Sequence, residues 1–198
     1  TVHPIYAPGT PPDRMIPDVI DPNAGGDFGA FQTANRWTAT ATQPTGLQRG
    51  DATTLTWSIV RDGLSIAGFA GEQPNPSDLV SFLDGIYGNS GATFDQRPWF
   101  PILQQAFTTW GQSTGVTYVY EPNDDGAQFG ANIGQLGVRG DIRVGGHPID
   151  GQFGILAYNF FPNNGEMVID TSDSIFYGDT SGNSLGLRNV LAHEAGHG

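Results

Sequence analysis

Three residues near the end of the chain combine side chains that can bind a metal ion and use it. They occur in the stretch LAHEAGHG, residues 191–198, where Glu194 directly follows His193 and His197 lies four positions beyond His193. Residues four apart share one face of a helix, so both histidines can direct a ring nitrogen at a single ion. Zn²⁺ binds imidazole readily, and Glu194 could act as general base on a water molecule at that ion. The pattern predicts a zinc site on a helix.

A catalytic zinc has three protein ligands, and this motif supplies two. The other histidines are His3, in a proline-rich segment, and His147, in the glycine-rich stretch GGHPIDG. A turn or surface position explains His147 better than a ligand role does, and His3 is an equally poor candidate. We therefore expect the third ligand to follow Gly198. On this interpretation the chain is truncated within its own site, and further C-terminal residues or a companion fragment complete it.

Composition restricts the class of protein. The 198 residues carry 20 acidic and 8 basic side chains, all of the latter arginine, which gives a net charge of −12. This charge, without a basic cluster, argues against nucleic acid as a partner and favours divalent cations. No apolar run approaches the roughly 18 residues of a spanning helix, so membrane insertion is not expected. Cysteine is absent, which excludes disulfides and thiolate sites, and the many glycines and prolines suit a loop-rich secreted protein.

The chain divides into a proline-rich start and one domain. Six of the 14 prolines fall within the first 22 residues. Such a segment cannot form a regular helix or a central strand, so residues 1–30 are predicted to be an extended arm or a propeptide remnant. Residues 31–198 then form the domain.

Hydrophobic periodicity predicts a mixed arrangement of strands and helices. Alternating or β-branched runs predict strands at 53–60, 116–121, 141–144, 154–161 and 166–170. Apolar residues at helical spacing predict helices at 76–88, 97–115 and 184–198. Asn75 or Ser77 could cap the first of these helices, and Asn183 or Ser184 the last. The expected fold is α/β (α+β), a mixed sheet with two long helices, the second of which carries HExxH.

Several stretches resemble a known family in the family's order. HEAGHG resembles the first part of HExxHxxGxxH, the signature of matrixin-type metzincins, which are zinc endopeptidases. WFPILQQAFTTWGQSTGVTYVY resembles the first helix and following strand of secreted bacterial matrixin-like proteins, and GDIRVGGHPIDG, GILAYNFFP and GEMVIDTSD follow. The resemblance covers about residues 35–198. It implies a twisted mixed sheet in which 154–161 is an antiparallel edge strand beside the cleft, and it makes 31–198 the N-terminal part of a catalytic domain.

The resemblance also implies roles for individual residues. Leu156 and Ala157 fall where the family's substrate-lining residues lie, although plain strand core is an equally good interpretation. Asp150, Asp170 and Asp173 resemble the family's calcium site, and oxygen ligands from a glycine-rich loop suit Ca²⁺. The alternative is that these aspartates cap turns. A second acidic cluster, EPNDDGA at 121–127, is interpreted as a solvated turn.

Together these features predict a secreted zinc-dependent endopeptidase in which Glu194 activates a zinc-bound water. The partner would be a protein or peptide substrate that binds to the edge strand in extended form. A gluzincin-type peptidase, whose third ligand is a downstream Glu, is a second enzymatic possibility. The non-enzymatic alternative is a structural or binding module of an extracellular assembly, built on a matrixin-like domain.

Overall fold

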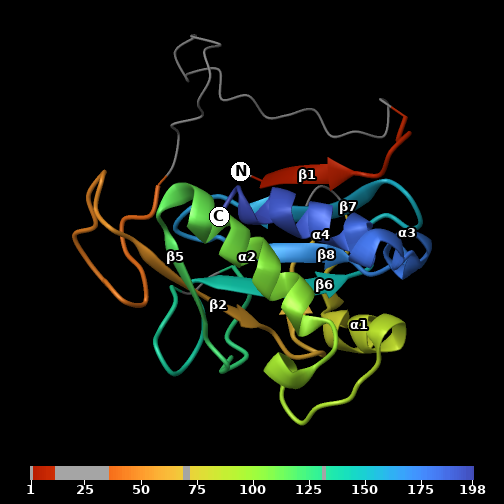
Figure 1. Ribbon diagram of the computed structural model, residues 1–198, viewed down its shortest axis with the longest axis horizontal. Coiled ribbons are helices and arrows are strands. Elements are labelled where there is room, and N and C mark those ends of the chain that lie inside the picture. The colour runs from red at the N-terminus through yellow and green to blue at the C-terminus, as the bar shows by residue number, and fades with distance from the viewer. Residues whose placement is uncertain (1, 12–35, 69–71, 131–132) are drawn as a thin grey trace.

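The computed structural model describes residues 2–11, 36–68, 72–130 and 133–198. Six strands form one sheet in the order β1-β7-β8-β6-β2-β5, and β3 and β4 form a separate small ribbon (Figure 1). The strands are β1 Val2–Tyr6, β2 Thr54–Ile59, β3 Ser65–Ile66, β4 Asn75–Pro76, β5 Thr117–Tyr120, β6 Ile142–His147, β7 Ile155–Phe160 and β8 Met167–Asp170.

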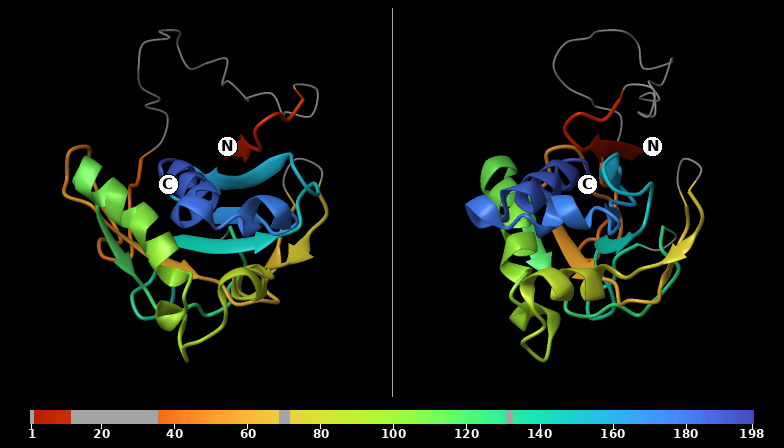
Figure 2. Two further views of the ribbon diagram at one scale, coloured as in Figure 1. Left: turned by 45° about the vertical axis from the view of Figure 1, so that its right-hand side comes forward. Right: turned by 90° about the vertical axis from the view of Figure 1, so that its right-hand side faces the viewer.

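Helices cover one face of this sheet. They are α1 Leu79–Tyr87, α2 Phe100–Thr114, α3 Ser174–Gly178 and α4 Ser181–Ala195, together with the 3₁₀ turn η2 Phe94–Gln96. Figure 2 shows α2 and α4 on the same side of the sheet. Within the described ranges, no helix is both long and apolar enough to cross a membrane. The predicted fold class, a twisted mixed sheet with two long helices, is confirmed.

The sheet is parallel at its centre and antiparallel at one side. β6 pairs in parallel with both β2 and β8, and β2 also pairs in parallel with β5. β7 is antiparallel to β8 and to β1. A parallel strand covered on both faces is expected to be buried along its whole length. All six residues of β6 are buried, including Arg143 and His147.

The predicted apolar stripe of α2 packs on the centre of the sheet. Trp57 of β2 stacks on Phe107 with ring centroids 4.6 Å apart, and on Phe100 at 5.4 Å. Phe100 and Phe107 are seven positions apart, which is about two helical turns. They therefore lie on the same face of α2, and both rings contact this tryptophan. Gly115 ends the helix with φ of 77°, a left-handed conformation that glycine adopts without strain.

The prediction that Asn75 or Ser77 caps α1 is wrong. The N-cap is Asp78, and its side chain makes no capping hydrogen bond. Instead Asp62, in the loop after β2, accepts hydrogen bonds from the amides of Val80 and Ser81, both at 2.9 Å. A carboxylate at a helix N-terminus satisfies free amides and interacts favourably with the helix dipole. The cap therefore comes from a residue distant in sequence.

The start of the chain is part of the main sheet. Val2–Tyr6 forms β1, which pairs antiparallel with β7. Proline is tolerated in edge strands, which agrees with Pro4 lying in this one. The family resemblance implied that β7 is the edge strand, and that expectation is wrong, because β1 lies outside it. Residues 12–35 of the expected arm lie outside the described residues, and the domain boundary near residue 30 stays a prediction.

Candidate metal centre

The helix that carries the motif begins in an irregular turn. Gly182, Asn183 and Ser184 have φ near 60° and interrupt the helical geometry, so the regular helix follows them. Asn183 and Ser184 thus stand at the predicted start, but the N-cap is Thr180, and it makes no side-chain cap hydrogen bond. The buried side chains of the helix face the main core; they are Leu187, Val190, Leu191, Glu194 and Ala195.

The two motif histidines meet as the sequence predicts. Nε2 of His193 lies 3.1 Å from Nε2 of His197, and the two rings are nearly perpendicular at 77°. Two imidazoles on one tetrahedral zinc, each about 2.0–2.1 Å from it, have nitrogens roughly 3.3 Å apart. His193 is exposed, while His197 is partly buried and meets Phe161 edge-on at 5.9 Å. The pair has the right donor atoms at the right separation to hold zinc.

Glu194 lies beneath this pair with no exposed surface. Neither carboxylate oxygen has a well-formed hydrogen bond among the described residues. Burial raises the pKa of Glu194 to about 9, and the backbone amide of Ile5, in β1, acts weakly in the opposite direction. Desolvation disfavours a charged carboxylate, so in this conformation Glu194 carries a proton at neutral pH.

Helix α2 holds the end of the motif in place. The indole Nε1 of Trp110 donates to the carbonyl oxygen of Ala192 at 2.6 Å. A Cβ on Gly196 would lie 2.5 Å from the same indole ring, closer than real contacts allow. Glycine at this motif position therefore lets α2 and α4 approach closely. The sequence pattern places Trp110 in an apolar stripe but does not predict this contact, because no local pattern reveals a partner 82 residues away.

Replacing Gly196 by alanine should disturb the zinc ligands. The added methyl must push Trp110 or the helix end aside, which would move His197, so we expect about tenfold weaker zinc binding, measured by competition with a metal indicator. Gly85→Ala is the matched control, since Gly85 lies within α1 and a Cβ there meets nothing within 4 Å. That variant should bind zinc normally and be more stable by about 0.5–1 kcal/mol. Equal zinc affinities in both variants would contradict the packing argument.

The predicted substrate-lining residues lie on β7. Leu156 and Ala157 are buried, 2% and 0% exposed, and belong to the main core. Ala157 pairs with Ile5 of β1 in the strand register. The hydroxyl of Tyr177, in α3, donates to the carbonyl of Leu156 at 2.6 Å. The strand-core interpretation therefore describes both residues in this conformation, and a substrate role stays a proposal.

The three predicted calcium ligands gather around one loop. Asp170 accepts hydrogen bonds from the amides of Ile149 at 3.0 Å and Asp150 at 3.2 Å. Asp173 accepts one from the amide of Phe153 at 2.6 Å, while its Oδ2 is buried without a hydrogen bond among the described residues. Burial, with the charges of Asp170 and Asp150, raises the pKa of Asp173 to about 6. Turn capping accounts for these contacts, and among the described residues no group of three such side chains is arranged to hold a metal ion, so a cation site here stays a proposal.

The second acidic cluster is a solvated turn only in part, because Asn123 and Asp125 are exposed while the side chains of Glu121 and Asp124 are buried. Asp124 makes two hydrogen bonds with the buried guanidinium of Arg143, from Nη2 at 2.7 Å and from Nε at 2.8 Å. Glu121 is also buried and accepts the amide of Gly137 at 2.7 Å. The cluster folds inward because Arg143, on the central strand β6, needs a counter-charge. Glu166 lies 3.5 Å from Arg143 on another side, and burial raises its pKa to about 7.

His147 does not join the motif histidines. It is fully buried at the end of β6, with Nε2 3.6 Å from a carboxylate oxygen of Glu72. Burial lowers its pKa. Among the described residues no group of three or more His, Asp or Glu side chains is arranged to hold a metal ion, so the third zinc ligand is not found there.

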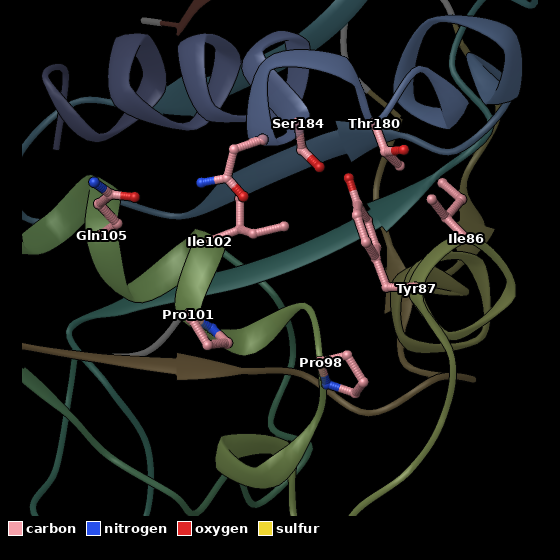
Figure 3. Close-up of a pocket in the computed structure, with 9 residues that line it drawn as sticks. Ile86, Tyr87, Pro98, Pro101, Ile102, Gln105, Thr180 and Ser184 are labelled. Atoms are coloured by element: carbon pink, nitrogen blue, oxygen red, sulfur yellow. The ribbon is translucent and has the colours of Figure 1, made fainter.

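A pocket lies away from the motif residues. It measures about 450 Å³, between α1, α2 and the irregular start of α4, where Tyr87 directs its hydroxyl toward Thr180 and Ser184 (Figure 3). Its lining contains no acidic, basic or imidazole side chain; the residues are Ile86, Tyr87, Pro98, Pro101, Ile102, Gln105, Thr180, Asn183 and Ser184. Such a lining offers no acid–base pair, so the chemistry must be sought at the histidine pair.

A twisted mixed sheet with a covering helix that carries HExxH defines the class of metzincin-like domains. Comparison with known families matches residues 87–198, more than half of the chain, to the family described as Matrixin. The chain belongs to the matrixin family, a family of zinc-dependent metalloendopeptidases.

Individual relatives agree with this assignment. The chain is 32% identical over 95 residues to the hatching enzyme of Paracentrotus lividus, and 34% identical over 101 residues to Metalloendoproteinase 1-MMP of Arabidopsis thaliana. Each match covers 48% of this chain, but only 15% and 26% of the respective relative. The match to Metalloendoproteinase 4-MMP of Arabidopsis thaliana, at 30% identity, covers 28% of that protein. The chain thus spans a minor part of the length of these relatives.

Proposed function

We propose that this chain carries the zinc-binding part of a secreted endopeptidase that hydrolyses peptide bonds. The observation that carries the proposal is the pair of imidazole nitrogens 3.1 Å apart, one from His193 in α4 and one from His197 in the turn that follows it. His193 and His197 would hold Zn²⁺ together with a third ligand, for which the family pattern suggests histidine. The net charge of −12 agrees with a peptide substrate and argues against nucleic acid or an anionic membrane.

In this proposal, different residues of the chain have different roles in hydrolysis. Zinc, when bound, polarises the scissile carbonyl and stabilises the negative charge that develops on its oxygen. Strand β7 would bind an extended peptide through main-chain hydrogen bonds, with Leu156 and Ala157 beside it. Glu194 would take a proton from the attacking water and pass it to the leaving amide nitrogen. To do so it must be ionised, which requires water or a cation in place of its present apolar cover.

Removal and return of the metal tests this proposal. The protein should bind one zinc ion and cleave an unfolded protein such as casein; a chelator should abolish cleavage, and added zinc should restore it. His193→Ala and His197→Ala should each weaken zinc binding by at least about 100-fold, because two ligands cannot replace three. His147→Gln, a change at a distant histidine, should keep the metal. A protein that binds no zinc, or binds it and cleaves nothing, would favour the structural or binding module instead.

We also propose that calcium binds at Asp150, Asp170 and Asp173. The buried Oδ2 of Asp173, without a hydrogen bond among the described residues, supports this, because a cation would satisfy it. Millimolar calcium should raise the melting temperature by several degrees relative to a chelator, and magnesium should do so less. Asp173→Asn should lose most of that increase, whereas Asp51→Asn, at an exposed aspartate outside the loop, should keep it. Equal calcium effects in both variants would show that the aspartates only cap turns.

A further inference from the structure

The pocket between α1, α2 and the start of α4 takes no part in the proposed hydrolysis. Its volume is about 450 Å³, and small-molecule sites in proteins usually measure about 300–1,000 Å³ (Figure 3). Several of its lining residues are exposed, among them Pro98, Gln105 and Asn183. A ligand can therefore reach the pocket from solvent without displacing a helix.

The lining of this pocket carries no formal charge. Among the described residues that form it, none is Asp, Glu, Arg or His, although the whole chain has 20 acidic and 8 basic side chains. Metal ions and phosphates are usually held by charged or imidazole side chains. A charged ligand that exchanges water for uncharged groups also loses free energy. The pocket therefore favours an uncharged ligand.

One side of the pocket is rich in hydroxyl and carboxamide groups. Thr180 and Ser184, at the start of α4, lie on this side, and Tyr87 directs its hydroxyl toward them (Figure 3). Gln105 of α2 and Asn183 add carboxamides to the lining. A hydroxyl both donates and accepts hydrogen bonds, and a carboxamide offers two donors and an acceptor. Groups of this kind match a ligand that itself presents several hydroxyls.

The opposite side is apolar and rigid. Pro98 and Pro101 lie across the pocket from Thr180 and Ser184, and Pro101 belongs to the first turn of α2 (Figure 3). The proline ring fixes its own φ, so this wall is formed before a ligand arrives and loses little entropy on binding. A suitable ligand presents C–H groups to the prolines and hydroxyls to the other side. The ring of a neutral sugar combines both.

Two features of the polar side are costly in the free protein. Asn183 and Ser184 have φ of 59° and 57°, a left-handed conformation that residues other than glycine adopt infrequently. The hydroxyl of Tyr87 is enclosed and has no well-formed hydrogen bond among the described residues. Burial raises the pKa of Tyr87, and Ser184 lies near enough to lower it. Strained backbone and buried polar groups without partners are concentrated at ligand sites, which supports a binding role here.

We propose that this pocket binds a neutral sugar unit, whose hydroxyls bond to the polar side and whose C–H face packs on the prolines. The inference goes beyond the proposed function, because neither His193 nor His197 lines the pocket. Such a site tethers the protein to a glycan or to a glycosylated protein. It thereby raises the local concentration of peptide bonds near α4.

Sugar binding is measured on the zinc-free protein by ligand-detected NMR with maltose, cellobiose, lactose and chitobiose. At least one of these neutral disaccharides should bind, with a Kd in the millimolar range or below. Gln105→Ala should weaken binding about fivefold, since it removes hydrogen bonds to the sugar. Gln104→Ala is the matched control, because Gln104 is the preceding residue of α2, is also exposed and does not line the pocket. Its affinity should equal that of the wild-type protein.

Two further variants separate recognition from folding. Tyr87→Phe removes only the hydroxyl, and Asn183→Gly removes the carboxamide while suiting the left-handed turn. Each should weaken binding of the sugar about fivefold and leave the melting temperature of the free protein unchanged or higher. Weaker binding with a lower melting temperature in both variants would show that these groups only hold the helices together, which contradicts the proposal.

Three other results overturn the proposal. If none of the four disaccharides binds, the pocket is not a sugar site. Equal affinities in Gln105→Ala and Gln104→Ala would place the sugar elsewhere on the protein. Binding of the neutral peptide APPAPA without binding of any sugar would identify a peptide-docking site instead. Because no measurement uses zinc, a failure of the protease proposal appears separately, as a zinc-loaded protein that cleaves nothing.

Discussion

Glu194→Gln should abolish peptide hydrolysis while making the zinc-free protein more stable. A positioned general base contributes about 10²–10⁴-fold to the rate, so activity should fall by at least that factor. Glutamine has nearly the same shape and keeps both histidines in place, so zinc binding should be unchanged. His193→Ala is the comparison, because it should lose zinc and activity together. Loss of activity with loss of zinc in Glu194→Gln would contradict a role as base.

The stability gain follows from the pKa of the buried carboxyl group. Burial raises the folded-state pKa of Glu194 to about 9, from an ordinary value of 4.5. An acid whose pKa is raised by folding costs nothing at low pH, and its cost grows as pH rises from the unfolded value towards the folded one. At pH 7 Glu194→Gln should therefore be more stable by about 2–3 kcal/mol, with little difference near pH 4.5. Urea unfolding in the presence of a chelator measures both values. A variant less stable than wild type at pH 7 would refute this account.

Arg143→Met should destabilise the fold by about 3–5 kcal/mol, because it leaves buried carboxyl groups without their cation. Arg143 has no exposed surface and binds Asp124 through two nitrogens. Arg139→Met is the matched control. Its partner, Asp125, belongs to the same acidic cluster but is 39% exposed, so that bridge should be worth less than about 1 kcal/mol. Urea unfolding measures the free energy of unfolding of both variants. Similar losses would show that burial does not make the Arg143 pair more important for stability than the exposed Arg139 pair.

The loss caused by Arg143→Met should grow with pH. Without the guanidinium, the folded-state pKa of Glu166 should rise further above its unfolded value, because Arg143 now lowers it. The free energy of unfolding of the variant should then fall as pH rises from the unfolded-state pKa of Glu166 to its raised folded-state pKa. The variant should therefore be least stable near pH 8. In the wild-type protein, the Glu166 pKa of about 7 predicts a shallower loss between about pH 4.5 and 7. Glu166→Gln should remove that slope.

Periodic segments were predictable because their signal is local. The apolar stripe of α2, the alternation of β2 and the spacing of His193 and His197 each follow from residues a few positions apart, and the structure contains all three. The kink at the start of α4 was harder to predict. Asn183 and Ser184 suggested side-chain caps, and the structure shows instead backbone with positive φ. Short polar residues suit both roles, and only the surrounding fold selects one.

The interactions that sequence analysis missed join distant residues. Asp62 replaces the expected cap of α1, and Asp124 neutralises Arg143. An aspartate in a turn looks the same whether it faces water or a buried arginine, so composition alone suggested solvent for the acidic cluster. β1 was missed for a related reason. Its prolines correctly excluded a central strand, but nothing in VHPIY indicates which edge of the sheet receives it.

The pairing of β1 with β7 also affects the order in which the molecule assembles. The two strands are about 150 residues apart in sequence, whereas β7 and β8 are near neighbours. Closing a long loop costs more chain entropy than closing a short one, and contacts between distant residues slow folding. We therefore expect β7, β8 and α4 to come together before β1 docks. During that interval the newly formed histidine pair and Glu194 share one open surface, so a metal ion can enter before the base is enclosed.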